Sequence, residues 1–215
     1  MTADVDTKGY CSGMSIPGAG GETTAGPAAP GLGWSALTSP EKRERLLTAA
    51  ASVFSGKGLD APMSDVAEAA GAGVASVYRL YPSKYELYAA LVVRRMEQIT
   101  AAARDAESLP GDRWTALTQM LRNLVAEQSV EPFVGEARAL VCDHQDVIEW
   151  TARAAEAQER VLAAARAEGR LRGDATSLDL RLLFAATRAA KRLEPEHWPR
   201  MLELMLDALD SERST

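Results

Sequence analysis

The sequence predicts an all-α protein, and three observations support that prediction. Residues that favour helix, above all Ala, Leu, Glu and Arg, are plentiful, whereas residues that favour strands are scarce. Apolar residues recur at helical spacing along most of the chain after residue 39, and no fixed-period repeat or strand pair is visible. Gly and Pro residues divide this pattern into segments of helical length.

The composition is that of an ordinary globular protein. The 215 residues are 47% hydrophobic and 25% charged, with a formal net charge of −6. This total gives no general sign of nucleic-acid binding, although a small DNA-binding surface needs only a local positive face. No apolar run approaches the roughly 20 residues of a membrane span, and no secretory signal pattern is present. We therefore expect a cytoplasmic protein without a membrane partner.

Residues 1–38 are expected to form a disordered tail. Eight Gly and three Pro residues fall within residues 1–33, where apolar residues are sparse and aperiodic. Such a segment cannot bury enough apolar surface to offset its conformational entropy. Because Cys11 lies in this tail, we expect no structural disulfide with the second cysteine, Cys142. Order is expected to begin at Ser39-Pro40-Glu41, with Ser39 as the N-cap of the first helix.

Residues 39–88 are predicted to form an N-terminal helical domain. Its first helix ends near Gly58, and its second runs from about residue 62 to residue 70. A Gly71-Ala72-Gly73 turn precedes a third helix over residues 74–81, which Pro82 closes. The capping box Ser83-Lys84-Tyr85-Glu86 opens a fourth helix, expected to reach about residue 107 and to belong to both domains.

Residues 89–215 are predicted to form a second, helical domain. Beyond the fourth helix, the apolar pattern predicts helices at about 112–129, 131–142, 146–168, 177–193 and 196–209. Breaks between them fall at Glu131-Pro132, at residues 169–174 and at Glu194-Pro195.

The second and third helices, with their glycine turn, have the pattern of a helix-turn-helix motif. A recognition helix needs small residues near its N-terminus so that its backbone can approach the major groove. The third helix supplies such residues, together with groups that can contact bases or phosphates. The candidate DNA-binding residues from this reasoning are Lys42, Arg43, Val74, Ala75, Ser76, Tyr78, Arg79 and Lys84.

Each of these assignments has an ordinary structural alternative. Arg79 and Lys84 could be solvated surface residues, and Tyr78 could serve packing. Six basic and six acidic residues lie between residues 40 and 88, so the domain is formally neutral. DNA binding therefore requires Lys42, Arg43, Arg79 and Lys84 to gather on one face.

Residues 41–100 resemble the DNA-binding domain of the TetR family of transcriptional regulators. The resemblance lies in the segments RERLLTAAASVF, DVAEAAGAG and VASVYRLYPSKYEL, with Gly58 after the first. The family pattern is met by Ala70-Gly71, by Ser76-Val77-Tyr78, and by Tyr81, Ser83-Lys84 and Leu87.

The resemblance implies a fold of nine or ten helices, a homodimer, and a C-terminal domain that binds a small ligand and releases operator DNA. It also implies phosphate contacts at the start of the second helix. The usual Thr-Thr is replaced there by Ala61-Pro62, so Ser64 is the nearest hydroxyl substitute. Ala72, Gly73 and Ala75 also depart from the family pattern, which affects the base sequence that would be read rather than the fold.

A ligand pocket is expected in the C-terminal domain, since clefts between bundle helices are common ligand sites. The same side chains could simply form the core. Cys142, Asp143, His144 and Asp146 are better explained as a loop cap than as a metal site, and no catalytic set or cofactor motif is present. The candidate pocket residues are Trp114, Met120, Leu121, Leu124, Phe133, His144, Trp150, Phe184 and Arg188, with Arg122 and Trp198 as further candidates.

The last two helices are predicted to form a dimer interface. The last helix is apolar around nearly its whole circumference, although no further chain remains to cover its outer face. The preceding helix has small residues that permit close approach, so both helices are expected to pair with their symmetry mates. The predicted interface residues are Leu178, Leu182, Ala185, Ala189, Met201, Leu202, Met205 and Leu209.

The function predicted from these observations is a DNA-binding transcriptional regulator, most plausibly a repressor released by a small ligand. Two alternatives are a helical carrier or enzyme that retains only the helix-turn-helix shape, and a protein-interaction adaptor. The adaptor hypothesis predicts no positive face on the third helix.

Overall fold

The computed structural model describes residues 33–127 and 133–211, whose regular elements are helices, as the sequence predicts. The order is α1 (Ser39–Lys57), α2 (Met63–Ala70), α3 (Val74–Leu80), α4 (Lys84–Ser108), α5 (Arg113–Glu127), α6 (Val134–Leu140), α7 (Gln145–Ala167), α8 (Ser177–Leu193) and α9 (Trp198–Leu209). Across these residues the only β pairing is an isolated bridge between Leu171 and Asp210. The predicted all-α fold is confirmed.

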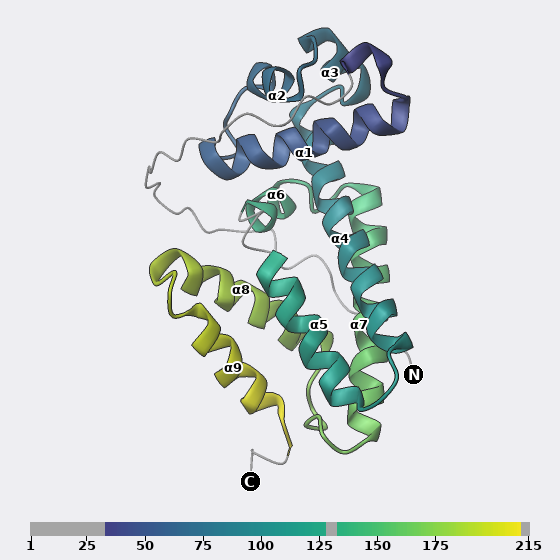
Figure 1. Ribbon diagram of the computed structural model, residues 1–215, viewed down its shortest axis with the longest axis vertical. Helices are drawn as coiled ribbons and strands as arrows, with labels where there is room; N and C mark the ends of the chain where they lie inside the picture. Colours follow the sequence, from purple (N-terminus) through teal and green to yellow (C-terminus); the bar gives the residue numbers. More distant parts are fainter. Residues whose placement is uncertain (1–32, 128–132, 212–215) are drawn as a thin grey trace.

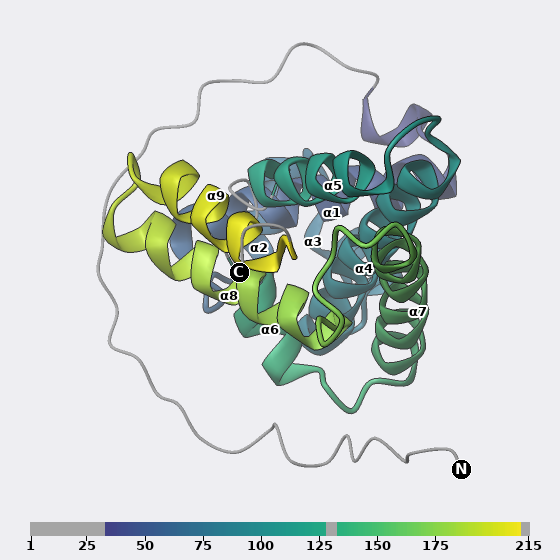
Figure 2. The same cartoon turned by 90° about the horizontal axis from the view of Figure 1, so that it is seen from below.

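Helices α1, α2 and α3 form the upper end of the molecule, and α4 leads from them into the lower part, where it packs along α7 (Figure 1). Helices α8 and α9 pack against each other on one side, as both views show (Figures 1 and 2). The elongated α4 therefore connects the helix-turn-helix region to the rest of the chain.

The first helix begins one residue earlier than the sequence predicts. Thr38, not Ser39, is the N-cap, and Pro40 lies in the first turn. The Thr38 backbone N–H and hydroxyl each donate to the Glu41 carboxylate at 2.7 Å. Glu41 is three residues after Thr38, so only Thr38 can complete this reciprocal capping box.

The predicted tail mostly falls outside the described residues, but its last part is structured. Trp34–Ala36 form a short 3₁₀ helix, η2, and Trp34 packs against the N-terminal core. The Lys42 ammonium lies 6.0 Å from the centroid of the Trp34 ring. Burial of the large Trp34 ring next to α1 stabilises this segment, which explains why order begins before residue 39.

The turn between α2 and α3 depends on Gly71. Gly71 has a φ of 64° and ψ of 34°, the left-handed conformation that ends α2. Its N–H donates to the Glu68 carbonyl, and the Ala72 N–H donates to the Ala67 carbonyl. Residues with a β carbon adopt this conformation at a cost, whereas glycine does so freely.

Helix α3 ends where Pro82 requires it to end. Tyr81 has an extended backbone with a φ of −134°, so the helix stops at Leu80, one residue before the predicted end. Ser83 then caps α4 by accepting a hydrogen bond from the Glu86 N–H at 3.2 Å. The Gly71 turn before α3 and the Tyr81-Pro82 stop after it therefore determine the direction of α3.

Two buried clusters form the core. The first combines α1, α2, α3 and the start of α4 with Phe133, Val134 and Ala137 around α6. The second lies among the lower half of α4 and helices α5, α7, α8 and α9. Helix α6, although it follows the expected domain boundary at residue 88, therefore packs against the helix-turn-helix region.

Cys142 is disulfide-bonded in the structure, which contradicts the expectation of no structural disulfide. The sequence contains one other cysteine, Cys11, which lies outside the described residues. Among the described helices, none is both long and apolar enough to cross a membrane.

Candidate DNA-binding surface

Helix α3 is anchored by one face and presents the other to solvent. Val77 is fully buried, whereas Val74 and Tyr78 are 42% and 47% exposed. Ala75 and Arg79 are exposed too, and Ser76 is half-buried. The predicted recognition residues therefore share the outer face of one short helix at the upper end of the molecule (Figure 1).

A hydrogen bond within α3 positions its only charged side chain. Arg79 donates from Nη2 to the Ser76 hydroxyl oxygen at 2.9 Å. The two residues are three apart and so lie on the same helical face. The guanidinium keeps its remaining N–H donors for a base edge or a phosphate.

Helix α1 contributes a basic side chain beside α3. The Arg43 guanidinium lies 5.8 Å from the centroid of the Tyr81 ring, at the end of α3. Burial raises the pKa of Tyr81, and the positive charge of Arg43 partly opposes that shift. Arg43 is thus held next to the recognition helix, while Lys42 lies over Trp34.

Lys84 ties the end of the α1–α2 connection to the start of α4. Its ammonium donates to the Leu59 carbonyl at 3.1 Å and to the Asp60 carbonyl at 2.9 Å. The Tyr88 hydroxyl also donates to the Leu59 carbonyl. Sequence reasoning assigned Lys84 to phosphate contact alone and missed this internal role, because its partners lie 24 and 25 residues away.

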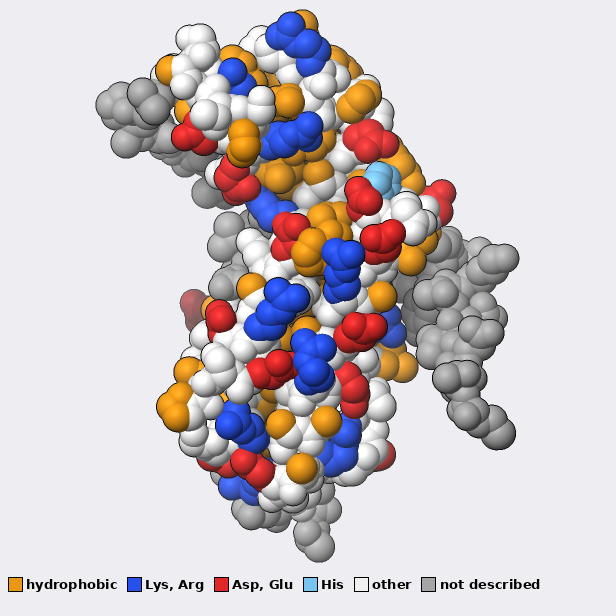
Figure 3. Space-filling model, turned by 90° about the vertical axis from the view of Figure 1, so that its right-hand side faces the viewer, with side chains coloured by type: hydrophobic (Ala, Val, Ile, Leu, Met, Phe, Trp, Pro, Cys, Tyr) orange, Lys and Arg blue, Asp and Glu red, His pale blue; other side chains and the backbone are white. Residues whose placement is uncertain are grey.

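The remaining predicted contact, Ser64, is exposed in the first turn of α2. Beside it, Asp65 pairs with Lys57 at 2.7 Å, so these two charges cancel each other. Figure 3 shows both basic and acidic side chains in the upper part of the molecule, as in the part below it. The gathering of Lys42, Arg43, Arg79 and Lys84 on one face therefore stays a prediction.

The predicted pocket residues are not gathered at one place. Met120, Leu121, Leu124 and Phe184 are buried in the lower core, and Trp114 packs at its edge. These residues therefore form the core of the bundle, which is the structural alternative to a ligand pocket.

The other pocket candidates lie elsewhere. The Phe133 and Phe54 rings meet edge-on with centroids 5.8 Å apart, so Phe133 belongs to the upper core and not to the lower one. Trp150 is half-buried on α7, with the Arg153 guanidinium 4.8 Å from its ring centroid. Arg188 lies against Gly135 of α6.

His144 belongs to the junction between α4 and the turn before α7. Its Nε2 lies 3.4 Å from a Glu86 carboxylate oxygen, and its ring centroid is 5.6 Å from that of Tyr85. The Tyr85 hydroxyl donates to the Asp143 carboxylate at 2.7 Å, and this hydrogen bond raises the pKa of Tyr85. The junction joins residues 58 apart, so no local sequence pattern indicates it.

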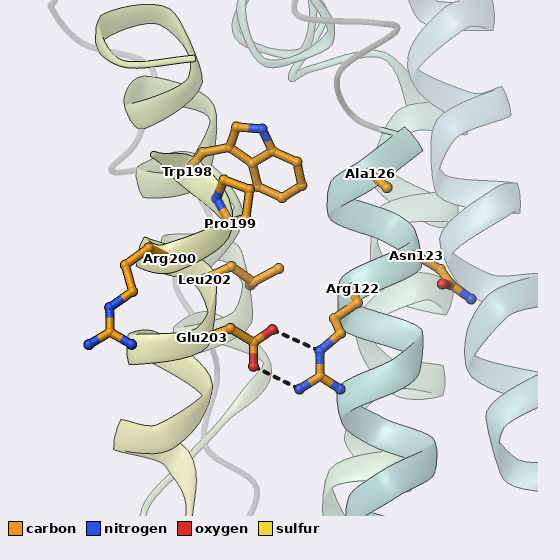
Figure 4. A pocket seen from close by; sticks show the side chains of 8 residues that line it. All are labelled: Arg122, Asn123, Ala126, Trp198, Pro199, Arg200, Leu202 and Glu203. Carbon is orange, nitrogen blue, oxygen red and sulfur yellow. Dashed lines mark hydrogen bonds and ion pairs between the residues drawn. The ribbon is translucent and has the colours of Figure 1, made fainter. Parts of the chain in front are cut away.

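An open groove of about 490 Å³ lies between α5 and α9 (Figure 4). Arg122 on α5 faces Glu203 on α9 across it, with Nε and Nη2 each 2.9 Å from a carboxylate oxygen. Trp198 and Leu202 supply apolar lining. The Arg122 charge is thus paired within the groove, while Arg200 is a second arginine among its lining residues.

The predicted dimer residues divide between surface and core. Leu178 and Leu182 on α8 are 43% and 54% exposed, and Ala185 is exposed one turn later. Ala189, Met201, Met205 and Leu209 are half-buried. The structure places Leu202 in the protomer's own core, while Leu204, which was not predicted, is 50% exposed. Sequence alone could not orient α9, because nearly all its faces are apolar.

Comparison with known proteins agrees with this architecture. A family model described as bacterial regulatory proteins of the tetR family matches residues 46–91. A TetR transcriptional regulator from Streptomyces coelicolor is 26% identical, with 78% of this chain and 98% of that chain covered and a TM-score of 0.60. A TetR regulatory protein from Mycobacterium vanbaalenii is 25% identical, with 79% and 95% covered and a TM-score of 0.58.

A search of curated proteins found no match. The matched residues span the helix-turn-helix region whose outer face carries Tyr78 and Arg79, and the structural likeness extends through the helical bundle below it. Residues 46–91 of this chain thus match the tetR family of bacterial regulatory proteins, and its overall fold is similar to that of solved TetR transcriptional regulators.

Proposed function

We propose that this protein is a homodimeric repressor that binds a palindromic operator and leaves it when a small-molecule effector binds. In this proposal, residues 39–88 bind DNA and residues 89–215 bind the effector and form the dimer. The observation that carries the proposal is the outer face of α3, where Val74, Ala75, Tyr78 and Arg79 are exposed around the fully buried Val77.

This face suits a DNA major groove. Small side chains at the start of α3 permit close approach of its backbone, and Tyr78 and Arg79 follow one turn later. In a two-fold dimer, two such helices would read half-sites about 34–36 Å apart, one turn of DNA. A protein-interaction adaptor would not need Arg79 on α3 and Arg43 beside the end of the same helix.

The dimer is supported by the exposed apolar side chains of α8 and α9. Leu178, Leu182 and Ala185 form a row at spacings of four and three residues, and Leu204 is exposed on the neighbouring helix. A monomer gains nothing from this exposed apolar surface, whereas a symmetric pairing of the two helices would bury it.

Effector response is supported by the course of α4. Its first turn carries Lys84, which holds the Leu59 and Asp60 carbonyls, and its lower half packs into the bundle core. An effector that favours a different bundle arrangement would change the separation of the two recognition helices and lower operator affinity by population shift.

The proposal is tested by gel-shift titration with the DNA upstream of the gene. We expect salt-sensitive, sequence-preferring binding, and about a tenfold or greater loss of affinity in Arg79→Ala, because a base contact by arginine contributes about 1–3 kcal/mol. Arg104→Ala, which removes an exposed positive charge near the C-terminal end of α4, is the matched control and should bind normally. Equal affinity of the wild type and Arg79→Ala would contradict the proposal.

A reporter assay separates a repressor from an activator. Deletion of the gene should raise expression from the bound promoter, and expression should fall again on complementation by the wild type but not by Arg79→Ala. A helical carrier without DNA binding would leave the reporter unchanged in all three strains. TetR-family regulators are non-enzymatic DNA-binding proteins, so no catalytic test is required.

A further inference from the structure

Helix α7 carries a narrow stripe of side chains that belongs to the interior of the bundle. Positions at spacings of three and four residues lie on one face of a helix, because seven residues correspond to two turns. Four members of the stripe are apolar and buried, whereas two are polar. In chain order the stripe consists of Val147, Thr151, Ala154, Gln158, Val161 and Ala165.

Gln158 is buried in this stripe without a hydrogen-bond partner. Its side chain is 5% exposed, and its amide makes no hydrogen bond to any residue of 33–127 or 133–211. A glutamine amide can both donate and accept hydrogen bonds, and removing it from water without a partner is costly. Native proteins contain few such groups, so the packing of the core does not account for an amide at this position.

Thr151, two helical turns before Gln158, has the second unpaired polar group. Its hydroxyl oxygen is buried and has no hydrogen-bond partner within the described part of the chain. The buried Thr100 and Thr187 each donate at 2.8 Å to the carbonyl four residues earlier in their own helix. The same bond is available to a threonine inside any helix, and Thr151 does not make it.

The stripe lies beside the helix that leads to the helix-turn-helix region. Helices α4 and α7 run side by side in the same direction (Figures 1 and 2). Just before α7, the Asp143 carboxylate accepts a hydrogen bond from the Tyr85 hydroxyl at 2.7 Å, and near the other end Arg160 pairs with Glu107 at 2.8 Å. The two unpaired groups lie between these two links, so a ligand bound there would be placed next to α4.

The chemistry of the two groups indicates the class of ligand. The Gln158 amide and the Thr151 hydroxyl are uncharged, and each can donate and accept a hydrogen bond. Two cations of the bundle, Arg95 and Lys191, already donate to backbone carbonyls of α5. A carboxylate buried beside uncharged groups is unfavourable. The stripe therefore suits a neutral, mostly apolar molecule that has hydroxyl or carbonyl groups.

We propose that Gln158 and Thr151 bind an uncharged effector through its hydroxyl or carbonyl groups, and that Gln158 determines which effectors are accepted. As effector recognition this inference rests on the function proposed above, whereas ligand binding at the stripe does not. A site built to hydrogen-bond a ligand rejects a molecule without the matching polar group, because the buried amide then stays unpaired. The α5–α9 groove is a different place, since neither residue lines it.

The first test measures stability and needs no ligand. Gln158→Met keeps the length of the side chain and removes the amide, so the cost of burying an unpaired polar group disappears. We expect its unfolding temperature to rise by roughly 2–4 °C, as measured by differential scanning calorimetry. Gln119→Met makes the same change at an exposed position on α5 and should leave the unfolding temperature nearly unchanged.

A purely structural role for the two polar groups predicts the opposite result. If buried water molecules bridged them to the core, their removal would leave those waters without partners and lower the stability. Thr151→Val, which keeps the shape of the side chain and removes the hydroxyl, is the second variant and should be at least as stable as the wild type. A lower unfolding temperature in both variants would overturn the inference.

The second test is calorimetric titration of the full-length protein, without DNA, with 1-octanol, 2-octanone and sodium octanoate, which differ in their polar groups. We expect saturable binding of at least one neutral probe to the wild type. Gln158→Met should bind that probe about fivefold more weakly, as the loss of one neutral hydrogen bond implies, and Gln119→Met should bind it normally. Octanoate should bind the wild type about tenfold more weakly than the neutral probe, because its carboxylate would be buried beside uncharged groups.

Three binding results would overturn the inference: no saturable binding of either neutral probe, equal affinity of the wild type and Gln158→Met, or tighter binding of octanoate than of both neutral probes. Gel-shift titration of the same preparations separates the ligand site from the function proposed above. A probe that binds through Gln158 without changing operator affinity would contradict the effector role alone. Preparations that bind the probe but no operator DNA would contradict the DNA-binding function and leave the ligand site standing.

Discussion

The residues of the recognition region combine exposure with internal contacts. Arg79 donates a hydrogen bond to Ser76, and Arg43 is held over Tyr81, so each guanidinium has a defined position in the protein without DNA. Side chains fixed in advance lose less conformational entropy on binding. This arrangement lets a domain with no net charge present basic groups beside the outer face of α3, where DNA binding is proposed.

Lys84 gives a prediction at this scale. Two of its three N–H donors are used by the Leu59 and Asp60 carbonyls, which leaves one for a phosphate. Lys84→Gln should therefore lower both the unfolding temperature and the operator affinity, as measured by thermal unfolding and gel shift. Lys57→Gln, which breaks an exposed pair with Asp65, should change stability little. If Lys84→Gln altered DNA affinity alone, its structural role would be disproved.

The helix-turn-helix depends on the geometry of its turn. Gly71 has a positive φ, and a β carbon there would lie 3.3 Å from Arg45. Gly73, two residues later, has a φ of −75° and open space around it. The two glycines of this turn therefore differ in whether they can be replaced by a residue with a β carbon.

Gly71→Ala should destabilise the protein by roughly 1–2 kcal/mol, the cost of a left-handed conformation for a residue with a β carbon. Chemical denaturation monitored by circular dichroism measures this change. Gly73→Ala is the matched control and should be nearly neutral in stability. Equal losses in the two variants would argue against the assigned turn.

Helix capping gives the chain a sensitivity to acid. Hydrogen bonds from Thr38 lower the pKa of Glu41 at α1, and hydrogen bonds from Thr176 lower that of Asp179 at α8. A carboxylate with a lowered folded pKa stabilises the protein above its unfolded pKa of about 4, and that stabilisation is lost as pH falls through the folded value. The first turns of α1 and α8 should therefore be less stable at acid pH.

The unfolding temperature of the wild type should fall between pH 6 and pH 3, and it should fall less in the double variant Glu41→Gln/Asp179→Asn. Gln and Asn keep hydrogen-bond acceptors at the caps but do not titrate. Differential scanning calorimetry across this range measures both slopes. Parallel slopes would show that these two caps do not contribute to the acid response.

At the scale of the whole molecule, the two cores are joined by α4 and by the contact of α6 with the upper cluster. The Tyr85–Asp143 hydrogen bond adds a polar link near the top of α4. A change in the bundle can therefore reach the recognition helix through packed elements rather than through a flexible connection.

The proposed dimer gives the prediction at this scale. Leu182→Glu should convert the dimer to a monomer, because a charge in a buried apolar interface is strongly unfavourable. Light scattering coupled to size-exclusion chromatography measures the mass. Ile148→Glu is the control, since Ile148 is a 46% exposed apolar residue on α7, which is not one of the two helices of the proposed interface. A wild-type monomer at micromolar concentration, or an unchanged dimer in Leu182→Glu, would contradict the proposed interface.

The sequence by itself determined the helices and the face of α3. Apolar periodicity, Gly71 and Pro82 are local signals, so the predicted helix over residues 177–193 matches α8, and the third helix differs by one residue. The family resemblance followed from the same local segments, since turn and capping residues act through neighbours in the chain.

Tertiary structure decided what local pattern cannot encode. An apolar side chain at helical spacing is equally suited to a core, a pocket or an interface, which is why Phe133 and Leu202 lie in cores rather than at their predicted sites. The partners of Lys84 and the packing of Arg188 against Gly135 join distant segments. Such contacts arise only when helices pack, because packing fixes which faces meet.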